Sequence, residues 1–186
     1  MENGYAVNNW KEDYYTNGQL LHKGYYIDGQ LKVYKNYYPD GTLEREFKNI
    51  DGFRSKSALY YPNGNIKSEI TYLNGAPILW IDYFNNGNME YFEEYNKNLL
   101  YHTAKKSFYQ TGQIESILEI TSKKKLHFLF YEYHKNGKTK VEGTLKYDMN
   151  MYDYYKTGTW IHFNEVGKET KHETYSDGKV IKSKDF

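Results

Sequence analysis

The strongest constraint on this chain is a glycine that returns at a nearly fixed interval. The intervals between successive glycines of the series are 23, 23, 23, 25, 25 and 30 residues. The series consists of Gly18, Gly41, Gly64, Gly87, Gly112, Gly137 and Gly167. A period of this size is typical of repeat proteins, in which one structural unit is stacked many times. We therefore predict a single repeat domain, residues 1–186, of about seven repeats.

The residues around each glycine predict a specific hairpin turn. Pro39 and Pro62 stand two positions before their glycines, and Asn or Asp directly precedes five of the seven. Proline fixes a negative φ, so it cannot occupy the first position of a type I′ turn. We therefore predict a type I turn followed by glycine at positive φ, which is the three-residue hairpin loop with a β-bulge.

This loop also predicts the strand register. It pairs the residue four before each glycine with the residue two after it, as in Tyr60 with Ile66. An aromatic ring opposite an aliphatic side chain is a favourable pair, worth about 0.2–1 kcal/mol. A two-residue loop would pair Tyr60 with Lys67 instead. The bulged loop is the better interpretation because it sets apolar against apolar.

A second turn follows the first after 11 residues, in the sequences Asp28-Gly29, Asp51-Gly52, Asn74-Gly75 and Asp177-Gly178. Each repeat then holds two short strands, and no window shows a sustained helical period. We predict an all-β fold: a single antiparallel meander sheet of about fourteen strands, elongated and twisted, with little or no helix. Wider spacing near Lys123 and in the segment 148–157 predicts a less regular second half.

Composition and spacing argue against an enzyme. The chain has no cysteine, which excludes disulfides, thiolate metal sites and cysteine nucleophiles. The six histidines form no H-x-x-x-H pair, and neighbours such as Glu93 and Glu94 point to opposite faces of a strand. His162 and His172 flank one turn without a third ligand. We predict no catalytic residues, no cofactor and no metal, unless a pocket joins a histidine to carboxylates across repeats.

Charge and hydropathy bear on the partner. Lys and Arg number 25 and Asp and Glu 24, whereas nucleic-acid binders show a basic excess, so the sequence argues against a nucleic-acid partner. The run Lys123-Lys124-Lys125 is shorter than the four to eight basic residues of a lipid-binding cluster, which leaves weak support for membrane lipid. No apolar stretch approaches the roughly 20 residues of a membrane helix.

The repeat resembles the bacterial variant of the MORN (membrane occupation and recognition nexus) repeat. The resemblance rests on Tyr60-Tyr61-Pro62-Asn63-Gly64-Asn65-Ile66, on its sister at 37–43, and on the Asn/Asp-Gly turn that follows. The segments 79–84 and 158–163 match the tryptophan-containing half of that repeat. The resemblance implies stacked β-hairpins, no catalytic residues and a protein-binding or scaffold role. In some members of the family that role is that of an antitoxin.

Strand alternation predicts two faces of the sheet. The apolar face would contain Tyr14, Leu20, Phe47, Ile70 and Leu118. The other face would carry charged residues and the candidate partner-binding rings Tyr15, Tyr38, Tyr61, Phe84, Tyr109, Trp80 and Trp160. Aromatic residues are enriched at interfaces. The alternative, which the preference of aromatic rings for half-buried strands favours, is that these rings shield the sheet.

The sequence thus predicts a non-catalytic protein-binding or scaffold protein, and the resemblance points to an antitoxin that binds a toxin. The alternative is a surface- or membrane-associated module of a larger exported bacterial protein. A natural start at Met1 would favour the cytoplasm, and a longer upstream sequence would favour export. Open sheet edges also leave pairing with a second copy open.

Overall fold

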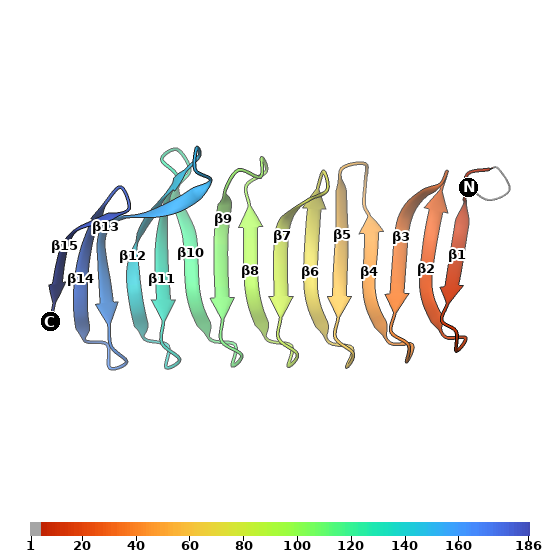
Figure 1. Ribbon diagram of the computed structural model, residues 1–186, viewed down its shortest axis with the longest axis horizontal. Helices are drawn as coiled ribbons and strands as arrows, with labels where there is room; N and C mark the ends of the chain where they lie inside the picture. The colour runs from red at the N-terminus through yellow and green to blue at the C-terminus, as the bar shows by residue number, and fades with distance from the viewer. Residues whose placement is uncertain (1–4) are drawn as a thin grey trace. The chain divides into compact units, whose positions relative to one another are not determined.

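The computed structural model describes residues 5–186, and all of the helix or strand structure in that range is β-strand (Figure 1). The strand order is the chain order, β1 to β15, and all pairs described are antiparallel. This confirms the predicted all-β meander. The chain divides into two compact units: unit 1 ends at Asn88 and unit 2 begins at Met89.

Seven strands belong to unit 1: β1 (Asn9–Tyr14), β2 (Leu20–Ile27), β3 (Gln30–Tyr37), β4 (Leu43–Asn49), β5 (Arg54–Tyr60), β6 (Ile66–Leu73) and β7 (Ala76–Tyr83). Eight strands belong to unit 2: β8 (Met89–Tyr95), β9 (His102–Phe108), β10 (Ile114–Ser122), β11 (His127–Tyr133), β12 (Thr139–Asp148), β13 (Asp153–Phe163), β14 (Glu169–Ser176) and β15 (Lys179–Asp185). Short loops join all of them.

The glycine turns have the predicted geometry. The seven glycines of the series have φ between 81° and 89°. In each turn the glycine N–H donates to the carbonyl three residues earlier, as from Gly64 to Tyr61 at 2.8 Å. Asn63 Oδ1 accepts the N–H of Asn65 at 3.1 Å, which holds the turn from its other side. Positive φ costs glycine little, which explains its return in every repeat.

The predicted register is also confirmed. Tyr37 pairs with Leu43 and Tyr60 with Ile66, and a bulge adjoins each pair. In unit 2, Phe108 pairs with Ile114 in the same way.

The bulge makes the predicted assignment of side chains to faces wrong. It inserts one residue after each turn, so the strand resumes with its alternation reversed. Phe47 therefore stacks on Tyr34, with ring centroids 5.3 Å apart, on the side opposite the Tyr37–Leu43 pair. The same reversal separates Tyr14 and Leu20 from the face of Phe47 and Ile70, and Phe108 and Ile114 from the face of Leu118.

We call the more buried side of each sheet its core face. In unit 1 the core face carries Phe47, Ile70 and Trp80 in adjacent strands. Ile70 is buried there, beside the small buried side chains of Ser57 and Ser68. A sheet face with one buried large side chain is thinly covered, so unit 1 depends mainly on its backbone ladder and cross-strand pairs.

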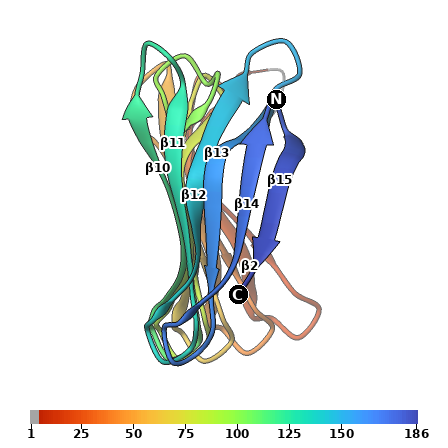
Figure 2. The same cartoon turned by 90° about the vertical axis from the view of Figure 1, so that its left-hand side faces the viewer.

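Unit 2 has the deeper core. Leu118, Phe128 and Tyr147 are buried together on its core face, and Phe128 has no exposed surface. The cover comes from β13, a strand of 11 residues that contains Gly158 at φ 66° (Figures 1 and 2). Tyr154, near the start of β13, packs edge-on against Phe128 with ring centroids 5.1 Å apart. The insertion that stretches the last interval therefore builds a core.

Trp160 anchors the other end of this core face. It is 3% exposed and stacks on Phe130 with ring centroids 5.5 Å apart. A Cβ placed on Gly143 would overlap the Trp160 ring, so only glycine leaves room for the indole at this position. The indole Nε1–H donates to the carbonyl of Thr144 at 3.2 Å.

We expect Gly64→Ala to lower the free energy of unfolding by about 1–2 kcal/mol, because a Cβ is strained at positive φ. Gly64 has open space around it, so the loss would report backbone strain alone. Gly52→Ala is the matched control, since Gly52 has equally open surroundings and no positive φ. Urea unfolding would measure both variants, and an equal stability for the two would contradict the turn assignment.

We expect Gly143→Ala to be more damaging, with a loss of about 1–3 kcal/mol from overpacking. The added methyl group must displace the Trp160 ring from Phe130. Thermal unfolding would give the loss of stability, and tryptophan fluorescence would show the displacement. A variant with unchanged stability and unchanged emission would refute the close approach.

Candidate functional site

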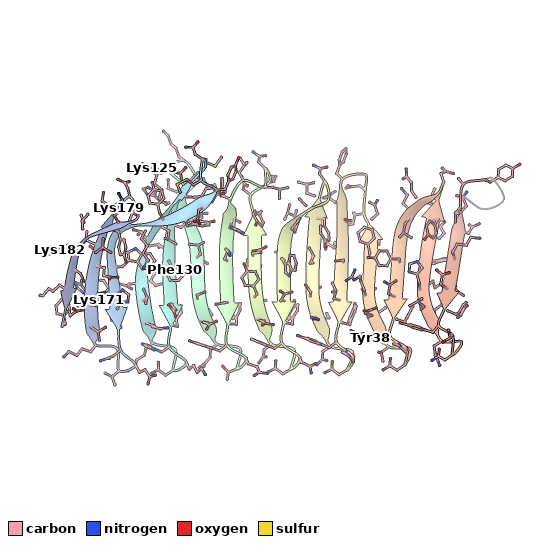
Figure 3. All side chains as sticks on the ribbon, in the orientation of Figure 1. Tyr38, Lys125, Phe130, Lys171, Lys179 and Lys182 are labelled. Carbon is pink, nitrogen blue, oxygen red and sulfur yellow. The ribbon has the colours of Figure 1, made fainter. Side chains whose placement is uncertain are left out.

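The predicted partner-binding rings lie in two separate places. The second ring of the repeat lies beside the glycine turn, where its hydroxyl reaches the next repeat. Tyr38, beside the β3–β4 turn in Figure 3, donates to the carbonyl of Tyr60 at 3.0 Å. Equivalent bonds run from Tyr15 to Tyr37 at 2.7 Å, Tyr61 to Tyr83 at 2.8 Å and, in unit 2, Tyr109 to Tyr133 at 2.7 Å.

We call this series of inter-repeat bonds the turn ladder. In the following repeat of unit 2, His134 replaces the tyrosine, and its Nε2 lies 2.9 Å from the carbonyl of Phe163. Phe84 has no hydroxyl and cannot donate such a bond. The tyrosines of the ladder are half-buried. Their hydroxyls are committed to the fold, and binding of a partner by their rings stays a prediction.

The two tryptophans lie away from the ladder. Trp80 is directly opposite Ile70 on the core face of unit 1, and its Nε1–H donates to Asp82 at 2.7 Å. Trp160 is part of the buried core of unit 2. The tryptophans and the rings of the turn ladder therefore lie at different positions along their strands. Partner binding by these seven residues stays a prediction.

The reverse side of the unit 1 sheet, which we call the groove face, offers a surface that sequence reasoning missed. A concavity of about 460 Å³ lies there over β3 to β7. Two rows of directly paired residues cross it. The first row is Val33, Lys48, Lys56, Thr71 and Leu79. The second row is Lys35, Glu46, Ala58, Glu69 and Ile81.

Lys48 and Lys56 are the unusual pair of the groove. They are directly opposite each other on β4 and β5, and both are exposed. Like charges in this position destabilise a sheet. Neither lysine forms an ion pair within the part of the chain that the structure describes. The groove therefore holds two adjacent positive charges that the fold itself does not use.

The glutamates of the second row are held by tyrosines. Tyr60 donates its hydroxyl to Glu46 at 2.8 Å, and Tyr83 donates to Glu69 at 2.7 Å. Burial and these carboxylates raise the pKa of both tyrosines to about 12, so they remain donors at neutral pH. Lys35 lies 3.5 Å from Glu46. The second row is thus internally satisfied, in contrast to the lysine pair.

The pairing of Lys48 with Lys56 could have been derived from the sequence only with the geometry of the loop between them. Asp51-Gly52 was predicted as a turn, but this loop differs from the other second turns. Asp28 and Asn74 have positive φ in two-residue turns, whereas Asp51 Oδ1 accepts the N–H groups of Phe53 and Arg54. Among residues 5–186, no group of His, Asp and Glu could hold a metal ion.

Comparison with known families agrees with this architecture. Three segments match the MORN repeat variant. They are residues 11–28, 29–49 and 58–74. The second and third contain β3, β4, part of β5 and β6, which carry most of the groove. The matches confirm the MORN repeat variant for these three segments. Repeats of this family are often involved in binding and are generally not catalytic.

Other comparisons add little. Two solved structures, described as "Crystal Structure of TcdB2-TccC3-Cdc42" and "Crystal Structure of TcdB2-TccC3-TEV", align at 12% identity with a TM-score of 0.27. Each alignment covers 90% of this chain but only 11% of the matched chain. A comparison with curated proteins gives no match. In the described residues there is no helix able to cross a membrane.

We expect Tyr38→Phe to lower the free energy of unfolding by about 0.5–1.5 kcal/mol, the usual net value of one hydrogen bond. The carbonyl of Tyr60 would lose its donor from the preceding repeat. Tyr152→Phe is the control, because Tyr152 is 71% exposed. Urea unfolding of both variants would measure the difference, and no loss for Tyr38→Phe would show that the ladder adds nothing to stability.

Proposed function

We propose that this protein is a non-catalytic binding module that holds a segment of another protein against the groove face of unit 1. The observation that carries the proposal is the Lys48–Lys56 pair, two unpaired charges that face each other beside a concavity. No carboxylate among residues 5–186 offsets the repulsion between these two lysines, so a carboxylate on a partner could do so. The proposal therefore assigns the partner an acidic segment.

The dimensions of the groove suit an extended peptide. Crossing from β3 to β7 covers four strand spacings, or about 19 Å. About six residues of extended chain cover that distance. Such a segment would meet Val33 at one end and Leu79 and Ile81 at the other, with the lysines between them. Apolar side chains flanking one or two acidic residues would match this order of contacts.

In its finer form, the proposal is that the partner is a toxin and this protein its antitoxin. The support for this form is the resemblance to the MORN repeat variant, for which some members are antitoxins. A protein that covers part of a toxin need not catalyse anything. Its effect would follow from the affinity of the groove and from which surface of the toxin is covered.

We expect Lys48→Glu to weaken binding of the partner and to stabilise the free protein. The new glutamate would face Lys56, turning a repulsive pair into an attractive one worth about 0.2–1 kcal/mol. The same charge reversal would repel an acidic segment and weaken binding by about ten-fold or more. Lys182→Glu is the charge-matched control, since Lys182 is exposed on β15 (Figure 3).

The experiment begins with a native purification of the tagged protein and identification of the copurified partner. Titration of that purified partner then compares wild type, Lys48→Glu and Lys182→Glu, and thermal unfolding compares their stability. Loss of affinity confined to Lys48→Glu supports the groove. Equal affinity for all three proteins overturns it. Expression of the partner alone tests the antitoxin form, which requires that the partner arrest growth and that coexpression restore it.

A further inference from the structure

The core face of unit 2 contains a second concavity, of about 270 Å³. One side of it is apolar, formed by Leu118, Phe130 and Leu145. The polar part of the lining comes from Tyr91, Lys105, Lys106, Ser107, Ser116 and Tyr154. Phe130, labelled on β11 in Figure 3, separates this concavity from the Trp160 stack. An apolar wall facing a few polar groups is the usual composition of a small-molecule site.

Lys105 supplies an available positive charge. Glu93 is directly opposite it on β8, yet no ion pair joins the two within the described residues. The Glu93 carboxylate accepts the hydroxyl of Tyr91 at 2.6 Å and lies 3.4 Å from His102 Nε2. Glu93 is 15% exposed and does not line the concavity, whose charged residues are lysines. The Lys105 ammonium lies over the ring of Tyr91, 5.8 Å from its centroid, and no acidic residue of the described chain lines the concavity.

Two further groups near the lysine, His102 and Tyr154, are uncharged at neutral pH. Burial, aided by the charge of Lys105, lowers the pKa of His102, so the imidazole is uncharged at neutral pH. The Tyr154 hydroxyl is hydrogen-bonded to His102 Nδ1 at 3.1 Å. Burial raises the pKa of Tyr154 to about 12. Tyr154 lines the concavity and adds no negative charge to it at neutral pH. An anion placed beside Lys105 would therefore meet no ionised group of these two residues.

A pair of hydroxyl groups stands next to the lysine. Ser107 and Ser116 are directly opposite each other on β9 and β10, with their Oγ atoms 2.8 Å apart. One hydroxyl hydrogen makes that bond, and the other can donate to an outside oxygen. A cation and a hydroxyl donor side by side can hold a carboxylate or phosphate oxygen by charge-assisted bonds.

We propose that this concavity binds a small molecule that carries an anionic oxygen group on an apolar body. The anion, a carboxylate or a phosphate, would lie between Lys105 and the Ser107–Ser116 pair. The body would pack on Leu118, Phe130 and Leu145. The volume is just below the usual range of about 300–1,000 Å³, which favours one aromatic ring or a short alkyl chain. This site is independent of the function proposed for unit 1.

The test is an NMR titration of the full-length protein with three probes: 4-phenylbutyrate, phenyl phosphate and the neutral 4-phenylbutanol. We expect saturable shifts of β9 and β10 amides with at least one anion, at concentrations below about 10 mM. The neutral alcohol should bind about ten-fold more weakly, because it lacks the charge that Lys105 attracts. The stronger of the two anions would identify the class of the anionic group.

Two variants and one control complete the test. Lys105→Met keeps the apolar stem and removes the charge, and should weaken anion binding about ten-fold. Ser116→Ala should weaken it several-fold, and provides a second test if Lys105→Met fails to fold. Lys182→Met is the control, since Lys182 is exposed on β15 and does not line the concavity. No saturation with either anion, equal binding of the alcohol, or unchanged binding by folded Lys105→Met or Ser116→Ala would overturn the proposal.

Discussion

The turn at each repeated glycine is the constraint on which the rest of the structure depends. The glycine N–H bonds back across the turn, the residue takes positive φ, and one extra residue enters the next strand. That residue reverses the alternation of side chains, so Phe47 and Tyr37 point to opposite sides although both adjoin the same hairpin. With two-residue loops and no bulge, different residues of β4 and β5 would face the groove. The row that contains Lys48 and Lys56 therefore depends on the bulge.

The sequence predicted the architecture well because its determinants are local. Turn chemistry around Gly64, the pairing of Tyr60 with Ile66, and the absence of helix from residues 5–186 all follow from residues near one another in the sequence. The site was poorly predicted because it depends on the sum of bulges over several strands. Lys48 and Lys56 meet only when the irregular loop at Asp51 is known, and Glu93 meets His102 only through the β8–β9 register. The predicted rings were real features of the repeat, but their hydroxyls form the turn ladder.

The two units use the same repeat differently. In unit 1 the repeats are regular, the core face is thin, and the uncompensated charge lies in an open groove. In unit 2 the longer β12 and β13 supply Tyr147 and Tyr154, which cover Phe128 and create a buried core. Burial there neutralises His102 and leaves Lys105 beside an apolar wall. The extended partner that we propose would bind the regular repeats of unit 1, and the small molecule that we propose would bind the core face of unit 2.

The bulge at each glycine decides which side chains share a face of the sheet. Nuclear Overhauser effects between side chains can show these faces in the unaltered protein. With the bulge in place, we expect strong contacts between the rings of Phe47 and Tyr34, whose centroids are 5.3 Å apart, and contacts between the Tyr60 ring and the Glu46 side chain. Contacts of Phe47 with the rings of Tyr37 and Tyr60, without contacts to Tyr34, would place these residues on one face and show that the bulge does not reverse the alternation.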